Sequence, residues 1–285
     1  MESSWNLRIL LRRLAGYEMT YPQLTLEEIV DSERAMIMDA SKRYGPHYKH
    51  ARATTVYLTL CIQSIELDRA DMFGRLFSLM KKHHTLSVLS ALRLHRVQAM
   101  MNLRQVLEAG AAAAFAIANP ETHHFVDVDA FGILDPSQKL TGKRYKWLDQ
   151  HYPNKSAWIA STKDRINSSA AHANIISGDC TFRIADDHSS ASAPFFDVED
   201  EYFVKADLWL ISSVAITLMD FFFGVAGDMA RAGRSVIDFR PDFQHTVEGL
   251  AAENNALLTE IQASERFQKA MQKVSQRSQG TAGTP

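Results

Sequence analysis

The feature that most constrains this chain is a long run, from Ala51 to Asn119, that contains no proline and only two glycines. Proline breaks the interior of a helix and glycine weakens it, so a run this poor in both favours continuous helices. Its apolar residues recur at the spacing of one helical face, as Leu89, Leu92 and Leu103 do. The spacing predicts three helices here, over about 52–66, 69–82 and 85–118.

Capping residues and prolines delimit the other helices. Thr25, followed by Glu27 and Glu28, is typical of a helix start, and Gly45-Pro46 is expected to end that helix. Asn119-Pro120 is expected to end the long run described above. The further helices that these signals predict span about 25–43, 137–150, 154–173, 203–226 and 244–275.

We therefore expect an all-α helical bundle with one small β-hairpin insertion. The hairpin would pair Thr181–Ile184 with Ala193–Phe196 inside a polar, serine-rich segment. The expected organisation is an N-terminal helical extension at 1–50, a bundle core at 51–243 with the polar insertion at about 174–202, and a C-terminal helix and tail of disordered composition at 244–285.

Composition narrows the classes of function. The formal net charge is −2, so any polyanion would have to be met by a local patch. The two cysteines, Cys61 and Cys180, do not form the pattern of a disulfide-stabilised fold. Cys61 lies in an apolar stretch, as is typical of a residue in the hydrophobic core. The unbroken run of apolar and small residues Leu208–Met219 is shorter than the roughly 20 residues of a membrane span, and no signal peptide is recognisable. We expect a cytoplasmic protein without membrane contact, metal or cofactor.

One polar helix face carries the residues that could perform chemistry. Arg165 and His172 are seven residues apart, which puts them on one side of a helix about 10 Å apart along its axis. Asn167, Ser168 and Ser169 lie between them and form a supporting polar face. An arginine can hold a phosphodiester, and a histidine can move protons near neutral pH.

The same segment resembles the HEPN superfamily of helical-bundle proteins. This similarity rests on the Arg165/His172 spacing. The run from about Leu89 to Met219 also resembles a bacterial helical family of unknown function with HEPN-like features, through the sequences at Leu103–Ala109, Ser168–Asn174 and Phe196–Glu201. This second similarity covers somewhat under half of the chain. The resemblance implies a bundle that forms homodimers and, in active members, a metal-independent ribonuclease site to which two protomers contribute Arg and His. Here Ile166 follows the arginine, where a polar residue is commoner.

The spacing alone is not specific, because Arg144 and His151 form a second pair that one helix could carry. A structural alternative for Arg165 is an ion pair with a carboxylate of the bundle, and for His172 a hydrogen bond at a helix end. Arg104 and Glu108 are four residues apart on an otherwise apolar helix, so we interpret them as a structural polar pair.

A local excess of positive charge lies between residues 69 and 104. It could bind RNA phosphates, or it could be offset in the fold by the acidic segments at 27–33 and 197–201. The candidate nucleic-acid residues in it are Arg75, Lys81, Lys82, Arg93 and Arg96.

Two classes of function follow. The first is RNA binding or metal-independent RNA cleavage of the HEPN type, in a toxin or defence setting, through Arg165 and His172. The second is a non-catalytic helical protein that forms dimers or binds a protein partner. A small-molecule pocket beneath the alanine-rich helix around Gly110 is a third alternative, for which the sequence alone singles out no residue.

Overall fold

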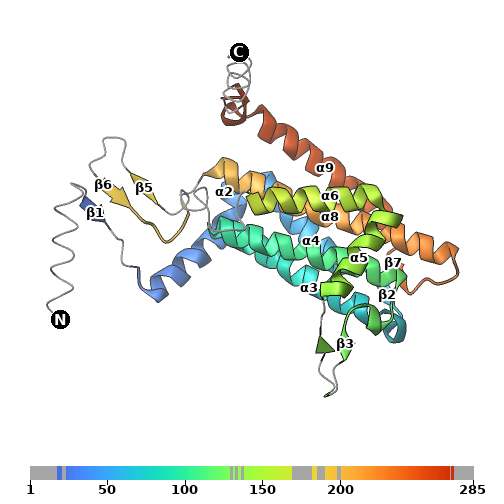
Figure 1. Ribbon diagram of the computed structural model, residues 1–285. Coiled ribbons are helices and arrows are strands. Elements are labelled where there is room, and N and C mark those ends of the chain that lie inside the picture. The colour runs from blue at the N-terminus through green and yellow to red at the C-terminus, as the bar shows by residue number, and fades with distance from the viewer. Residues whose placement is uncertain are drawn as a thin grey trace, which may run out of the picture.

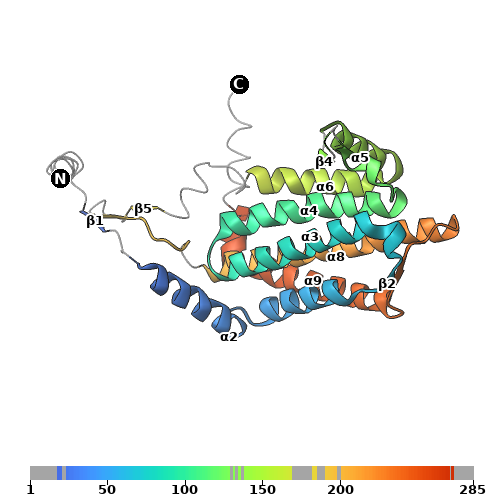
Figure 2. The same ribbon diagram turned by 90° about the horizontal axis from the view of Figure 1, so that it is seen from below.

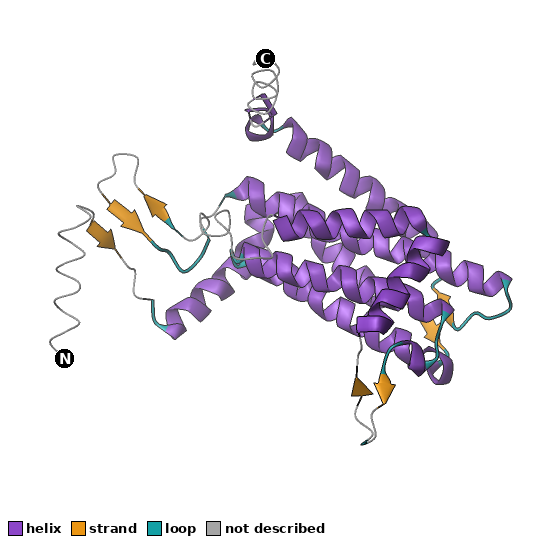
Figure 3. Ribbon diagram, viewed as in Figure 1, coloured by secondary structure: helices purple, strands orange, loops and turns teal. Residues whose placement is uncertain are grey.

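The computed structural model is a mostly helical bundle with small sheets of two or three strands outside it (Figures 1 and 3). It describes residues 18–20, 24–128, 131, 134–135, 138–168, 182–184, 190–197, 200–269 and 271–272. The helices are α2 (Leu26–Leu60), α3 (Leu67–Leu92), α4 (Arg96–Ala118), α5 (Gln138–His151), α6 (Pro153–Ile166), α8 (Glu201–Arg231) and α9 (Phe243–Ala263). The all-α architecture is confirmed.

Helices α4 and α8 form the centre of the bundle. Helix α4 packs along α3 and also contacts α5, α6 and α8, while α8 contacts α2, α3 and α9. Figure 2 shows α5 and α6 as an outer layer over α4. The alanine-rich part of α4 is buried, and a side chain at Gly110 would place its Cβ 2.6 Å from Leu218 Cδ1. The missing side chain at Gly110 therefore allows α4 and α8 to approach closely.

Helix α2 continues past Gly45-Pro46, where the sequence predicted its end. Gly45 has a φ of +49°, and the helix kinks there and then resumes to Leu60. Proline is tolerated in the first turn of a helix, so the segment after the kink begins normally at Pro46. The predicted start is confirmed, because Thr25 and Glu28 form a capping box.

The first half of α2 extends away from the bundle (Figure 2). Leu26, Val30 and Met38 on this half are 77%, 61% and 75% exposed. The expected boundary between extension and bundle at residue 50 falls within α2, five residues after the kink at Gly45.

The homodimer expected from the sequence remains a prediction.

The predicted break between residues 82 and 85 is wrong. Helix α3 runs through it to Leu92, because His83 and His84 do not break a helix and His84 is fully buried. The chain instead reverses at residues 93–95, where Leu94 has a φ of +58°. The true break therefore contains neither proline nor glycine, the two residues that mark breaks most clearly in a sequence.

The end of the helix predicted over 52–66 also differs from the structure. Helix α2 stops at Leu60, and β2 (Ile62–Ile65) pairs antiparallel with β7 (Ile237–Phe239), the strand between α8 and α9. Cys61, between α2 and β2, is fully buried as predicted. The pairing joins segments far apart in the sequence, so local spacing could not reveal it.

The predicted hairpin is confirmed with shifted bounds. Strand β5 (Arg183–Ile184) pairs antiparallel with β6 (Ser190–Ser192), and β1 (Glu18–Thr20) adds to β6 in parallel. The second hairpin strand was expected at 193–196. A further pair, β3 (Asp127–Val128) and β4 (Leu134–Asp135), follows the 3-10 turn Thr122–His124 after α4, between the helices predicted at 85–118 and 137–150.

Helix α8 is longer than predicted, beginning after a cap at Asp200 and ending at Arg231. By length and composition it could cross a membrane, and 61% of its most apolar window is buried inside the bundle. Most of the apolar residues of α8 thus pack on neighbouring helices.

Helix α9 ends at Ala263, and residues 265–269 form a further helical turn beyond it.

Candidate functional site between α4, α5 and α6

Polar side chains gather where α5 and α6 pack on α4. On α5, Thr141, Arg144, Tyr145 and Leu148 are spaced at i, i+3, i+4 and i+7, so they share one face of the helix. On α4, Arg104 lies one turn before Glu108, and Glu108 lies one turn before the alanines at 111 and 112. Lys163 on α6 lies one turn before Asn167, the residue that caps the end of that helix. The packing of the three helices against one another brings these short polar stripes to one junction.

Glu108 is the centre of the larger polar cluster. Its Oε1 atom lies 3.2 Å from Arg104 Nε and 3.2 Å from Lys163 Nζ. Arg104 also donates from Nη1 to Asn167 Oδ1 at 2.9 Å, and Lys163 donates to the Tyr145 hydroxyl at 3.3 Å. Together these contacts tie α6 to α4 and α5, and the predicted structural pair of Arg104 and Glu108 is present.

The protonation state of Lys163 follows from these contacts. Burial acts to lower its pKa, but Tyr145 and Glu108 outweigh burial, and the pKa of Lys163 is raised above its ordinary value. The lysine is therefore charged at neutral pH and its charge is balanced by Glu108.

Arg144 occupies the other end of the junction. Its Nη2 donates to Thr141 Oγ1 at 2.8 Å, and its guanidinium lies 5.7 Å from the centre of the Phe125 ring. Burial lowers the pKa of Arg144, and arginine stays charged at any physiological pH. Among the described side chains, no carboxylate lies within ion-pair distance of this guanidinium.

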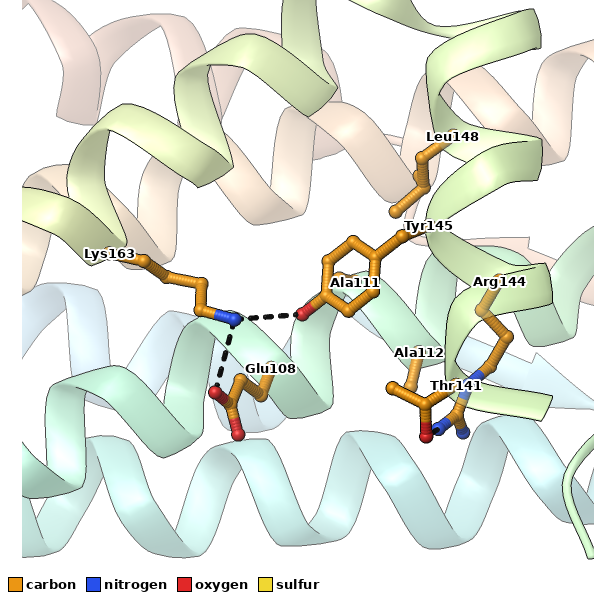
Figure 4. A pocket seen from close by; sticks show the side chains of 8 residues that line it. All are labelled: Glu108, Ala111, Ala112, Thr141, Arg144, Tyr145, Leu148 and Lys163. Carbon is orange, nitrogen blue, oxygen red and sulfur yellow. Dashed lines mark hydrogen bonds and ion pairs between the residues drawn. The ribbon is translucent and has the colours of Figure 1, made fainter. Parts of the chain in front are cut away.

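A pocket of about 220 Å³ lies between the two polar ends. Figure 4 shows Lys163, Glu108 and the Tyr145 hydroxyl at one end, and Arg144 with Thr141 at the other. The wall between these ends is apolar, made of Ala111, Ala112 and Leu148. The pocket thus combines two cations, one carboxylate and hydroxyl groups with a short apolar surface.

The predicted catalytic pair is described only in part. Arg165 is exposed near the end of α6, and Ser168 donates its hydroxyl hydrogen to the Arg165 carbonyl oxygen at 3.0 Å. Asn167 points to Arg104, as noted above. His172 and Ser169 lie outside the described residues, so the geometry of the Arg165/His172 pair stays a prediction.

Ion pairs occupy most of the positive stretch at 69–104. Arg75 pairs with Asp71 at 2.9 Å, Arg93 with Glu33 at 3.0 Å, and Arg96 with Asp207 at 3.2 Å. Of these three partners, only Glu33 belongs to the acidic segments that were expected to offset the charge; Asp71 lies within the stretch itself and Asp207 on α8.

The two lysines of this stretch differ from its arginines. Lys81 lies 5.1 Å from the centre of the Phe77 ring, and Lys82 is exposed. Lys82 is therefore the member of the stretch that can be changed with the least effect on packing.

Sequence reasoning missed Lys163 and Tyr145 and gave Arg144 a different role. The second arginine–histidine pair considered in the sequence joined Arg144 to His151. In the structure the His151 ring is tilted against Trp147, with the two ring centres 5.4 Å apart. The signal for the pocket was the i, i+3, i+4, i+7 stripe on α5, in which two polar residues, Thr141 and Arg144, occupy a face otherwise made of Tyr145 and Leu148.

Comparisons with known proteins add no assignment. The chain matches no family model, no curated protein and no solved structure. Within the described ranges, no three His, Cys, Asp or Glu side chains lie close enough together to hold a metal ion. The charged surface and the pocket are therefore the features that bear on function.

Proposed function

We propose that this protein binds RNA through the outer face of α5 and α6, and that it is a cytoplasmic, HEPN-like helical bundle. The observation that carries the proposal is local charge: residues 138–168 hold seven Lys and Arg against two acidic residues. The basic residues are Lys139, Lys143, Arg144, Lys146, Lys155, Lys163 and Arg165. This excess of five charges lies in a chain whose formal net charge is −2.

The placement of these cations supports the proposal. Lys143, Lys146 and Arg165 are exposed, and α5 and α6 form the outer layer of the bundle (Figure 2). Lys155 pairs with Asp220 and Lys163 with Glu108. Lys143 lies 2.9 Å from His124 Nδ1, an uncharged partner if that histidine is neutral, so its charge can still contact a phosphate, as can that of Lys146. Exposed cations of this kind supply most of the affinity of sequence-independent RNA binding, because bound phosphates release their counterions.

Aromatic residues accompany the cations. Trp147 and Trp158 lie in the same two helices, Tyr152 lies between them, and all three side chains are partly exposed. Stacking on aromatic side chains is the usual way in which proteins hold unpaired bases. Single-stranded RNA is therefore the form of nucleic acid that we propose.

The double variant Lys143→Glu/Lys146→Glu is expected to weaken binding of a fluorescent single-stranded RNA at least tenfold in an anisotropy titration. Each lost phosphate contact should also reduce the dependence of log K on log salt by about 0.7. Lys42→Glu/Lys49→Glu, which reverses two exposed charges on α2, is the matched control. Equal affinity of the double variant and the control would contradict the proposal, and a loss confined to Lys82→Glu would move the binding surface to α3.

Cleavage is the chemical extension of this proposal. We expect RNA cleavage that survives EDTA and is abolished in His172→Ala, because the histidine would move the proton and Arg165 would hold the phosphate. Overexpression of the native chain should inhibit growth, and His172→Ala should relieve the inhibition. If RNA binds normally but cleavage is absent, or is the same in His172→Ala, the protein is an RNA-binding protein without this nuclease activity.

A further inference from the structure

The pocket between α4, α5 and α6 has a composition that its structural role does not explain. An arginine that is partly buried normally gains a carboxylate partner, because charge removed from water is costly unless it is paired. Arg104 and Lys163 share the carboxylate of Glu108, as expected. Arg144 faces the same pocket, where it contacts the Thr141 hydroxyl and the Phe125 ring.

We propose that this pocket binds a small organic carboxylate, with the carboxylate group on the guanidinium of Arg144. The planar fork of arginine matches the two oxygens of a carboxylate and can bind them with two parallel hydrogen bonds. The Thr141 hydroxyl, already 2.8 Å from Arg144 Nη2, is placed to contact the same group. This inference does not depend on RNA binding, which we assign to the exposed lysines of α5.

The charges lining the pocket select a monoanion. Lys163 shares the carboxylate of Glu108 with Arg104, so the lining charge that no carboxylate of the described side chains pairs with is the single positive charge of Arg144. A monocarboxylate balances this charge. A phosphate dianion would exceed it and would also be repelled by Glu108.

Size and polarity define the remainder of the ligand. The volume of about 220 Å³ is smaller than the roughly 300–1,000 Å³ of pockets that hold drug-sized molecules. Ala111, Ala112 and Leu148 favour a short hydrocarbon body next to the carboxylate. At the far end, the acceptor of Glu108 and the donor of Lys163 suit a hydroxyl group (Figure 4). A hydroxy acid of about four carbons therefore fits best.

The test measures binding of 4-hydroxybutyrate to the full-length protein by calorimetry and by ligand-observed NMR. Butyrate lacks the hydroxyl, and 4-hydroxybutyramide lacks the charge. We expect 4-hydroxybutyrate to bind more tightly than butyrate, and the amide at least tenfold more weakly than the acid. Equal binding of acid and amide would overturn the assignment to Arg144.

Variants locate the site. Arg144→Met keeps the hydrocarbon stem against Phe125 but removes the charge, so binding of the acid should fall at least tenfold. Thr141→Val should weaken binding less, and serves as a second variant in case Arg144→Met unfolds. Lys82→Met, on α3, should bind like the native chain. Retention of full affinity in both pocket variants would overturn the proposal. So would the absence of carboxylate binding together with lower RNA affinity in Arg144→Met, because the pocket would then serve an RNA phosphodiester.

Discussion

Replacement of Arg96 with leucine is expected to lower the free energy of unfolding by about 3 kcal/mol at pH 8, because it removes one partner of a buried ion pair. Arg96 Nε lies 3.2 Å from Asp207, whose side chain is 8% exposed. The Arg96 guanidinium also covers the Phe203 ring at 4.8 Å. Without Arg96, Asp207 would be a buried carboxylate with its main counter-charge gone.

The loss should be smaller at acid pH. Burial raises the pKa of Asp207 to about 6 even with Arg96 opposing the shift, so removal of the arginine raises it further. A buried carboxyl group whose pKa is raised destabilises the folded state while it is charged. As pH falls through that pKa the group becomes neutral, and this cost to the free energy of unfolding disappears. The buried His84, whose pKa is lowered to about 4, destabilises the fold as pH falls, but it does so in both proteins and cancels in the difference.

Urea denaturation at pH 8 and pH 5 checks this expectation. Arg75→Leu removes a cation from an exposed pair with Asp71 and should cost less than about 1 kcal/mol at either pH. Equal losses in the two variants, or a loss in Arg96→Leu that does not change with pH, would show that the Arg96–Asp207 pair does not have the structural role assigned to it.

Phe222→Ala should cost about 4 kcal/mol, the largest effect that we expect from a single substitution in the core. Phe222 on α8 is fully buried and meets Phe73 and Phe77 of α3 edge to face, with ring centres 5.8 and 5.9 Å apart. Truncation removes the apolar surface, opens a cavity and breaks two ring contacts.

Differential scanning calorimetry should show a decrease in Tm of roughly 7 °C for this variant, since an unfolding entropy of about 2.1 cal/mol/K per residue makes 1 kcal/mol worth about 1.7 °C in a chain of 285 residues. The neighbouring residue, Phe223, is 39% exposed, and Phe223→Ala should lower Tm by less than half as much. A similar decrease in both variants would contradict the packing of α8 at the centre of the bundle.

Local features of the fold could be predicted from the sequence. The capping box at Thr25 and the pair of Arg104 and Glu108 each depend on residues three or four positions apart, and both are present. The helical periodicity of the chain likewise predicted the all-α bundle. By contrast, the reversal at Leu94 has no glycine or proline to mark it.

The candidate site depends on which helices meet, and spacing along one helix does not determine that. Arg144 could be predicted to lie on a helix, but not to face a pocket lined by Glu108 and Lys163. The pairing of Arg93 with Glu33 matches the acidic segment at 27–33 that the sequence offered as a counter-charge. Asp207 lies within the otherwise apolar sequence of α8. Its ion pair with Arg96 could not be predicted, because only the packing of α4 on α8 brings the two residues together.

The most direct test of the central claim is to crosslink the native protein to single-stranded RNA with ultraviolet light and to identify the linked peptides by mass spectrometry. The proposed function predicts crosslinks concentrated in residues 138–168, at the aromatic residues of α5 and α6, and their loss in Lys143→Glu/Lys146→Glu. Crosslinks concentrated at 69–104, or none above the level of an unrelated protein of similar charge, would contradict it.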